Sequence, residues 1–353
     1  GLVKPRKVIM LKRFLSYYKP QMGLFVADTV CALVLAAIDL AFPIILRNLT
    51  GGLFTQGQAA IMQALGMIAV GLVLMYVIRC ACRYFVSYWG HVMGARMESK
   101  MREDLFDQYE RFSFAYFDRN SSGDMMSRVV NDLFDICEAA HHVPEWIIIC
   151  GIEIIGSFVI LFTIAPVLAL AMAVVTAAFA VIMFWQNMRM REVFSDNRKK
   201  ISGINAQLQD SLAGMRVVKS FANEETERSK FRASNNRYLS SKENMYHAMG
   251  VYTATYGLLS GVLYVIVVLL GGWLVAQGQL QAVDMATFAL YISLFCTPLE
   301  TLVNSAEMYQ KAIAGFKRMD EVLSTAPDIQ DKPGATDLQV TAGAVDYHDV
   351  CFN

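Results

Sequence analysis

Four carboxylates lie inside long runs of apolar residues or at the end of one, where an uncompensated charge is costly. No lysine or arginine within these runs is expected to neutralise Asp39 or Glu153. The nearest candidates, Arg79 and Arg83, are predicted to lie at the inner, polar boundary of their run. Acidic groups in apolar surroundings suit the binding of a cation. The four carboxylates are Asp39, Glu153, Glu300 and Glu307.

Aromatic side chains in the same part of the chain could complete a cavity for an amphipathic cation, because aromatic faces attract positive charge. The hypothesis is a drug-like cationic or lipidic ligand. The alternative is that the carboxylates are protonated or hydrogen-bonded between helices, which we favour for Asp39. An unchanged ligand profile in Glu300→Gln and Glu153→Gln variants would support this alternative throughout. The other candidate cavity residues are Tyr256, Tyr264, Tyr291, Phe295 and Asn304.

The remaining reactive side chains suggest no catalytic or metal site. The seven cysteines are interpreted as free thiols, and Cys80 and Cys82 have no second ligand pair at zinc spacing. Adjacent helical residues point in different directions, so His141 and His142 are not expected to bind a metal. No G-x-x-x-x-G-K-[ST] phosphate loop occurs, so we expect the chain alone to hydrolyse no ATP and to hold no cofactor.

Composition indicates the environment of these residues. Of the 353 residues, 55% are hydrophobic and 18% are charged, against about 25% charged in soluble domains. Six apolar runs are near the twenty residues that cross a bilayer, which predicts an all-α integral membrane protein. The net charge of zero gives no support to nucleic-acid binding. The six spans are predicted near 22–46, 61–82, 144–165, 167–186, 251–276 and 285–306.

The distribution of charge predicts the orientation. Of the 31 lysines and arginines, only Arg47 is expected near the outer surface. Positive charge is retained in the cytoplasm, so both termini and the two long connections, 83–143 and 187–250, are predicted to be cytoplasmic, in a multi-pass protein of the cell membrane. These connections keep helical periodicity. The fifty residues from Ile61 would span roughly 75 Å as one helix, which predicts long cytoplasmic extensions.

The ends of the chain have a different character from the spans. Residues 1–20 are predicted to form an amphipathic elbow helix in the membrane interface, or alternatively a plain cytoplasmic helix. Residues 21–323 form the membrane domain. Residues 324–343 have the composition of a linker. Residues 344–353 alternate like a β-strand and are expected to begin a further domain that is missing here.

This arrangement resembles the membrane domain of ATP-binding-cassette (ABC) exporters of the bacterial multidrug or lipid type. Over most of the chain, the resemblance is carried by the short outer loops, the long cytoplasmic helices, the elbow and three local patterns. The first pattern is Tyr116-Phe117-Asp118 followed by Gly123, Ser127-Arg128 and Asn131-Asp132. The second is Leu212, Gly214, Val217-Val218-Lys219, Phe221 and Glu224. The third is Gln310, Ala314, Arg318, Glu321 and Leu323, although Asp320 stands where an apolar residue is expected.

The resemblance implies the membrane (permease) half of an exporter that moves amphipathic drug-like, lipidic or peptide substrates by alternating access. The full-length protein would use ATP and Mg²⁺. The implied partners are nucleotide-binding domains and a second membrane domain, identical or not, in a helix-swapped dimer of twelve spans. Gly257 and Gly261 have the spacing that permits close helix contact. The alternative is a secondary transporter or channel-like protein with no ATPase partner.

The tips of the two long connections would transmit motion from the nucleotide-binding domains. Exposed aromatic side chains there would suit a protein–protein pocket. Alternatively, they pack against neighbouring helices of the same chain. A Phe117→Ala variant is expected to uncouple transport from ATP hydrolysis. The candidate coupling residues are Phe114, Tyr116, Phe117, Asp118, Ser220, Phe221, Ala222, Asn223 and Glu224.

Overall fold

A computed structural model describes residues 6–332, 334–336 and 343–351. Within these ranges six helical segments are long and apolar enough to cross a membrane, which confirms the predicted spans. The short elbow helix α1 (Arg6–Tyr18) precedes the first span, α2 (Met22–Gly51). The second, α3 (Gln58–Phe85), continues through a π-helical turn at Val86–Gly90 into α4 (His91–Glu110). The remaining long helices are α7 (Leu133–Ile164), α8 (Pro166–Ala213), α10 (Glu224–Ile266), which runs through a π-helical turn (Val267–Gly271) into α11 (Gly272–Ala276), and α12 (Ala282–Ser324).

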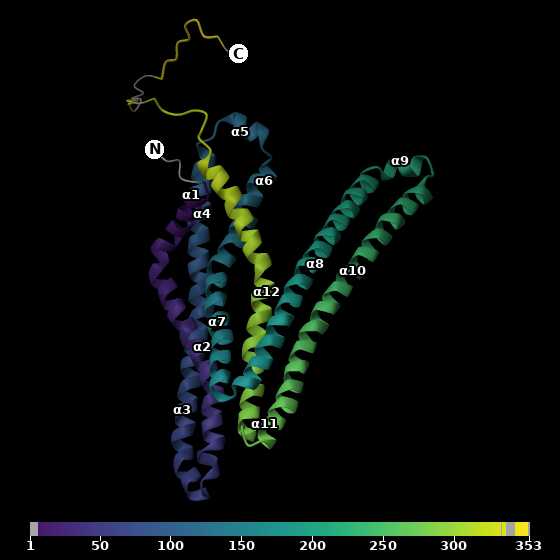
Figure 1. The fold of residues 1–353 in the computed structure, drawn as a ribbon. Coiled ribbons are helices and arrows are strands. Elements are labelled where there is room, and N and C mark those ends of the chain that lie inside the picture. The colour runs from purple at the N-terminus through teal and green to yellow at the C-terminus, as the bar shows by residue number, and fades with distance from the viewer. Residues whose placement is uncertain (1–5, 333, 337–342, 352–353) are drawn as a thin grey trace.

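The helices end where the sequence predicts. Pro166 begins α8 directly after the extended Ala165, since proline favours the first helical turn. Gly278 takes a positive φ in the turn between α11 and α12. We call the end of the molecule with these turns the short-loop end, and the opposite end the long-loop end (Figure 1). The long-loop end carries the short helices α5 (Phe114–Arg119), α6 (Ser122–Ser127) and α9 (Met215–Ser220).

The long helices form two groups. One group contains α1 to α4, α7 and α12, in which α7 packs along α12. The other is the hairpin of α8 and α10, which pack along each other. The two groups meet near the short-loop end and separate toward the long-loop end, where α9 closes the tip of the hairpin (Figure 1). The meeting point contains one buried core, with Phe288 and Tyr291 at its centre.

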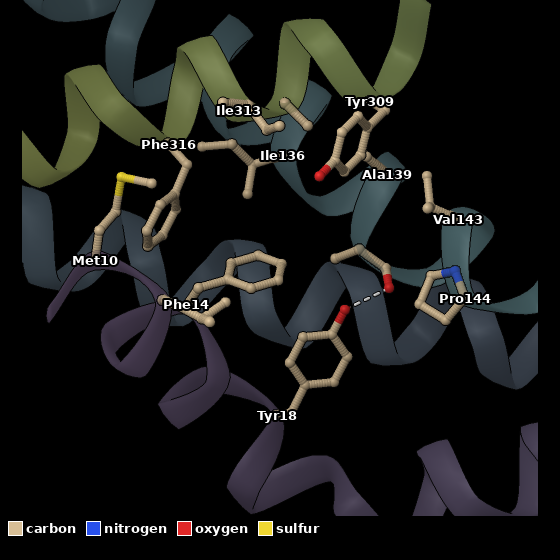
Figure 2. Close-up of a pocket in the computed structure, with 13 residues that line it drawn as sticks. Met10, Phe14, Tyr18, Ile136, Ala139, Val143, Pro144, Tyr309, Ile313 and Phe316 are labelled. Carbon is tan, nitrogen blue, oxygen red and sulfur yellow. Dashed lines mark hydrogen bonds between the residues drawn. The ribbon is translucent and has the colours of Figure 1, made fainter. Parts of the chain in front are cut away.

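The elbow helix α1 is held against the first group by polar and aromatic contacts. Arg13 pairs with the buried carboxylate of Asp320 at 2.5 Å, which explains an acidic residue where an apolar one was expected. The Tyr18 hydroxyl donates to the carbonyl of Ala140 at 2.5 Å. Leu11 and Leu15 are exposed. An apolar pocket separates α1 from α7 and α12, with Phe14 and Phe316 on its wall (Figure 2).

The strand predicted for residues 344–353 is absent from the part that the structure describes. Residues 343–351 are irregular and largely exposed, and Phe352 and Asn353 lie outside the described residues. A lone segment with strand periodicity has no neighbouring strand to satisfy its backbone groups, so the alternation alone does not create a strand. Within the predicted linker, 324–343, the described residues after Ser324 form turns and irregular structure.

Candidate functional site

A polar cavity of about 610 Å³ lies between the second, third and sixth spans. Glu153 and Glu145 project from α7, opposite Arg83 of α3. The π-helical turn Val86–Gly90 adds one further residue to a helical turn, and such turns are frequent at functional sites. The complete lining is Arg83, Val86, Ser87, His91, His142, Glu145, Trp146, Ile149, Cys150, Glu153, Ser293, Leu294, Thr297, Pro298 and Thr301.

Of the predicted cavity residues, Glu153 alone lines this cavity. Tyr291 and Phe295 have no exposed surface, so the expectation that they offer aromatic faces to a ligand is wrong for this conformation. The Tyr291 hydroxyl donates to the carbonyl of Leu40 at 2.5 Å, and Phe295 packs against Phe158 with ring centroids 4.8 Å apart. Both rings belong to the helix core because they point toward α2 and α7.

The other predicted residues lie outside the cavity lining. On α12, Asn304 accepts a hydrogen bond from the Tyr252 hydroxyl at 3.1 Å. Glu307 forms ion pairs with Lys311 at 3.1 Å and with Arg198 at 3.9 Å. Glu300, Tyr256 and Tyr264 also lie outside this lining. The predicted cavity residues therefore do not lie together in one site. Trp146 is the aromatic ring that the sequence analysis missed at the cavity.

Asp39 has a partner that the sequence analysis excluded. Arg79 of α3 binds both carboxylate oxygens, with Nε at 2.8 Å from Oδ1 and Nη2 at 3.2 Å from Oδ2. The expectation that no arginine neutralises Asp39 is therefore wrong. The favoured structural role of Asp39 is consistent with this pair. The error arose because the long Arg79 side chain reaches across to Asp39 on the neighbouring helix.

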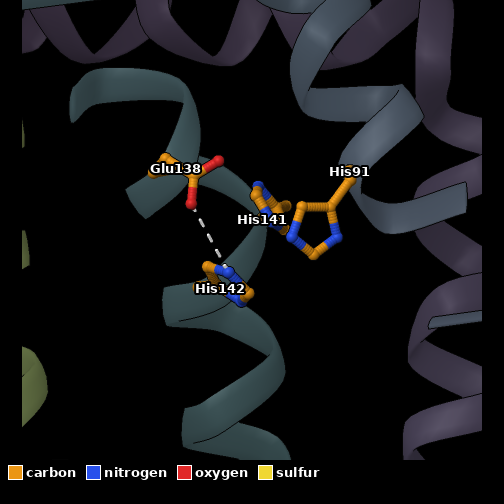
Figure 3. Close-up of side chains that lie close together, drawn as sticks. All are labelled: His91, Glu138, His141 and His142. Carbon is orange, nitrogen blue, oxygen red and sulfur yellow. Dashed lines mark ion pairs between the residues drawn. The ribbon is translucent and has the colours of Figure 1, made fainter. Parts of the chain in front are cut away.

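A group of histidines stands at the edge of the cavity. His141 and His142 do not diverge as their adjacency suggested, since their ring centroids are 4.0 Å apart. The His91 ring lies 4.5 Å from that of His141. Glu138, one turn earlier on α7, lies 3.6 Å from Nε2 of His142 (Figure 3). The expected divergence of the two rings is therefore wrong.

The two predicted tips both lie at the long-loop end, on α5 and after α9 (Figure 1). Phe114 is 90% exposed and Phe221 is 79% exposed, so neither packs against its own chain. Tyr116 instead stacks on Phe112 with centroids 4.0 Å apart. Burial raises the pKa of the Tyr116 phenol above its ordinary value, so the hydroxyl stays protonated near neutral pH. Of the aromatic residues predicted at the tips, Phe114 and Phe221 are thus exposed, whereas Tyr116 packs against its own chain.

The second tip contains a sharp turn after α9. Ala222 takes a positive φ of 50°, and the amide of Asn223 donates to the carbonyl of Val218 at 3.0 Å. This turn leaves Phe221 at the surface. Ser220, Asn223 and Glu224 surround the turn, and α10 starts at Glu224, where three glutamates in the first turn complement the helix dipole.

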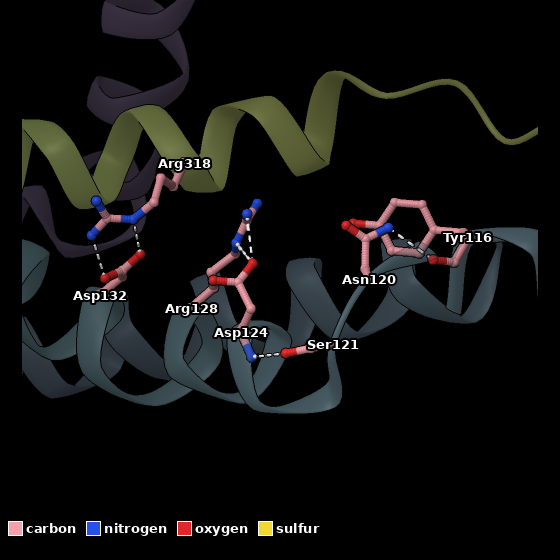
Figure 4. A network of polar contacts seen from close by, with 7 residues as sticks. All are labelled: Tyr116, Asn120, Ser121, Asp124, Arg128, Asp132 and Arg318. Atoms are coloured by element: carbon pink, nitrogen blue, oxygen red, sulfur yellow. Dashed lines mark hydrogen bonds and ion pairs between the residues drawn. The ribbon is translucent and has the colours of Figure 1, made fainter. Parts of the chain in front are cut away.

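A polar network joins the first tip to the last span (Figure 4). The Ser121 hydroxyl caps α6 by accepting from the amide of Asp124 at 3.1 Å, and Asp124 pairs with Arg128 at 2.8 Å. One turn further, Arg318 of α12 binds both oxygens of the buried Asp132, at 2.6 and 2.5 Å. The helical segment that follows the tip is therefore held to α12 through a bidentate ion pair.

The sequence matches a known protein family over most of its length. The family model described as the ABC transporter transmembrane region matches residues 25–299. The chain belongs to this family. It is 32% identical over 343 residues to the uncharacterized ABC transporter ATP-binding protein YwjA of Bacillus subtilis, covering 97% of this chain and 59% of that protein.

Two more distant ABC relatives have names that state a function. The chain is 22% identical to an ATP-dependent lipid A-core flippase of Syntrophus aciditrophicus, covering 98% of this chain and 57% of the flippase. It is also 22% identical to the putative multidrug export ATP-binding/permease protein YgaD of Bacillus subtilis, covering 97% and 60%. The ABC transmembrane region described here thus spans about 60% or less of the length of these relatives.

In this ABC transmembrane region, we expect an Arg318→Ala variant to be destabilised by about 1–3 kcal/mol, because Asp132 loses its partner while buried. Its melting temperature in nanodiscs should fall. An Asp132→Asn change in the Arg318→Ala background should cost little more. The exposed pair of Arg228 with Glu225 is the matched control, since surface pairs contribute about 0–1 kcal/mol. Equal losses in Arg318→Ala and Arg228→Ala would contradict the prediction.

Proposed function

We propose that this chain is the transmembrane half of an ATP-driven exporter that moves amphipathic drug-like, lipidic or peptide substrates outward by alternating access. The long-loop end and both termini would face the cytoplasm of a cell with the protein in its plasma membrane. Nucleotide-binding domains would dock there, with ATP and Mg²⁺ bound to them. The chain itself would contribute no catalytic residue.

The observation that carries this proposal is the pair of exposed aromatic tips at one end of the molecule. Phe114 and Phe221 come from separate loops and are exposed at the end where a cytosolic domain would bind. Large aromatic side chains are enriched at the centres of protein interfaces. The network through Asp132 and Arg318 connects the first tip to a span that lines the cavity. A docked domain would therefore have a mechanical connection to the pathway.

A second transmembrane domain is proposed as partner, in a helix-swapped dimer. The hairpin of α8 and α10 separates from its own group toward the long-loop end (Figure 1), where helices of the partner would pack. Gly257 and Gly261 on α10 have open space around them, since an added Cβ would meet no atom within 4 Å. Small residues at this spacing permit close approach of another helix.

The substrate class is proposed from the cavity. Glu145 and Glu153 provide acidic groups, and Trp146 provides an aromatic face, which together suit an amphipathic cation. The names of two relatives, a lipid A-core flippase and a putative multidrug export protein, agree with an amphipathic cargo for this chain as well.

The test is transport by the assembled transporter, with its nucleotide-binding domains, in inside-out vesicles. We expect uptake of a fluorescent lipophilic cation that requires ATP and Mg²⁺ and continues when ion gradients are collapsed. Uptake that depends on an ion gradient and not on ATP would instead identify the alternative, a secondary transporter or channel.

The cavity assignment is tested by two matched neutral substitutions. Glu153→Gln should change the relative rates for cationic and neutral substrates, because Glu153 lines the cavity. Glu300→Gln removes the same charge from α12 outside the lining and should change them much less. Identical substrate profiles for the wild type and both variants would assign Glu153 a structural role.

A further inference from the structure

Three histidines and a glutamate converge at the inner edge of the cavity, at the junction of α4 and α7. One donor atom from each of His91, Glu138, His141 and His142 can be chosen so that all lie within 4.8 Å of one another. Figure 3 shows the His91 ring approaching from α4 while the other three side chains come from consecutive turns of α7. Imidazole nitrogens and a carboxylate oxygen in such a group are the ligands of a divalent transition metal.

Two glycines bring these helices close enough for the group to form. An added Cβ at Gly94 would lie 3.0 Å from Nδ1 of His141 and 3.4 Å from the carbonyl of Cys137. At Gly90 it would lie 3.9 Å from Cδ2 of His141 on α7, and 3.3 Å from Oδ1 of Asp28 on α2. Small residues four apart permit this close helix packing. His91 follows Gly90 directly, so the approach of the backbones sets the distance between the rings.

His141 has the hydrogen-bond pattern of a metal ligand. Its Nδ1 lies 2.9 Å from the carbonyl of Cys137, which assigns the ring proton to Nδ1 as the donor. The other nitrogen, Nε2, then carries a free lone pair. It is buried and has no hydrogen-bond partner among the described residues. Metal-bound histidines commonly donate their second nitrogen to a carbonyl or carboxylate in this way. A buried nitrogen without a partner also calls for an explanation, which a ligand provides.

The surrounding charge suits a cation. Glu138 and Glu145 each lie 3.6 Å from a nitrogen of His142. Asp28 interacts electrostatically with Glu145 and His142, and its Oδ1 is buried without a hydrogen-bond partner among the residues described. The cavity lining next to the histidines includes one arginine, Arg83, and two carboxylates, Glu145 and Glu153. Two added positive charges would be compensated here.

We propose that His91, Glu138, His141 and His142 bind a Zn²⁺-like divalent metal ion that joins α4 to α7 at the edge of the cavity. Tetrahedral zinc with bonds of 2.0–2.1 Å needs donor atoms about 3.3 Å apart, so binding requires the rings to close by about 1–1.5 Å. His91 is exposed, so its ring has room to rotate toward α7. The ion would hold two helices of the pathway together, and its binding does not depend on the proposed export function.

The experiment measures metal content and affinity for the protein in nanodiscs, purified without a histidine tag. We expect one Zn²⁺ per chain after dialysis, and Co²⁺ as a spectroscopic probe should show the intense visible bands of a tetrahedral site. His91→Ala should weaken Zn²⁺ binding by at least about tenfold, because loss of an outer-shell partner alone costs 10–100-fold. Zn²⁺ should raise the melting temperature of the wild type and not that of His91→Ala.

Two variants separate loss of the site from loss of the fold. His91 is exposed, so its replacement leaves the core intact. His247 on α10 is exposed and remote from the cluster, and His247→Ala should bind Zn²⁺ like the wild type. Absence of stoichiometric Zn²⁺ in the wild type, or equal affinities for His91→Ala and His247→Ala, would overturn the proposal. Neither result would affect the transport assay of the proposed function.

Discussion

A Phe114→Ala transporter is expected to hydrolyse ATP while moving little substrate. Phe114 is 90% exposed on α5 and has no packing role in its own chain. Truncation of a central aromatic residue typically weakens an interface by about 2 kcal/mol or more, which is roughly 30-fold in affinity. Without this contact, the nucleotide-binding domains would still hydrolyse ATP but would be poorly connected to the spans. The measurement is the ratio of transport to ATP hydrolysis in proteoliposomes.

The control is Phe106→Ala, which removes an aromatic ring that is 58% exposed on the side of α4 and away from the tip. Its coupling ratio should match that of the wild type. Phe117, 42% exposed with its ring packed edge-on against Tyr116, should have a smaller effect than Phe114. A Phe114→Ala protein with an unchanged ratio would remove α5 from the docking surface.

An Arg79→Leu variant is expected to be destabilised, because it breaks an ion pair between two spans. It leaves the carboxylate of Asp39 without the arginine that binds both of its oxygens. Breaking a buried ion pair costs about 3–5 kcal/mol. The side chains of Arg79 and Asp39 are 40% and 23% exposed, so solvent or lipid headgroups reduce the loss to about 1–3 kcal/mol. The melting temperature in nanodiscs measures it.

The double variant Arg79→Leu/Asp39→Leu tests the mechanism. Replacing both partners by apolar side chains removes the unpaired charge, so we expect it to recover most of the lost stability. Arg47, which pairs with Asp284 near the short-loop end, provides the comparison at the membrane surface. If the double variant were less stable than Arg79→Leu alone, the ion pair would not be the cause of the loss.

Most of the helical architecture could be predicted because hydropathy and charge act along the chain itself. Apolar length predicts each span, and Pro166 and the turn after α11 are local signals. The pair of Arg79 with Asp39 could not be predicted in the same way. It depends on the axial offset between two spans, which neither run reveals alone. The absence of a strand from residues 343–351 has a related cause, since a strand requires a partner strand that lies outside the segment.

The candidate sites were harder to predict than the helices, because they also depend on how neighbouring helices are placed. Tyr291 and Phe295 have the right chemistry for a cavity, but the rotation of α12 turns both rings into the core. The convergence of His91 with His141 had one available signal, the four-residue spacing of Gly90 and Gly94. That spacing indicates close packing without identifying the neighbouring helix. Individual helices can therefore be read from the sequence, whereas residues that meet between helices cannot.

The separated hairpin of α8 and α10 has the geometry of a mechanical lever. With 48 residues in α8, its length is about 72 Å. A rotation of about 10° around its packed base near the short-loop end would carry α9 through about 12 Å, one helix diameter, while atoms about 10 Å from the pivot move less than about 2 Å. A repacking no larger than a side-chain adjustment around Phe288 is thus amplified into a displacement on the scale of a whole helix at the opposite end.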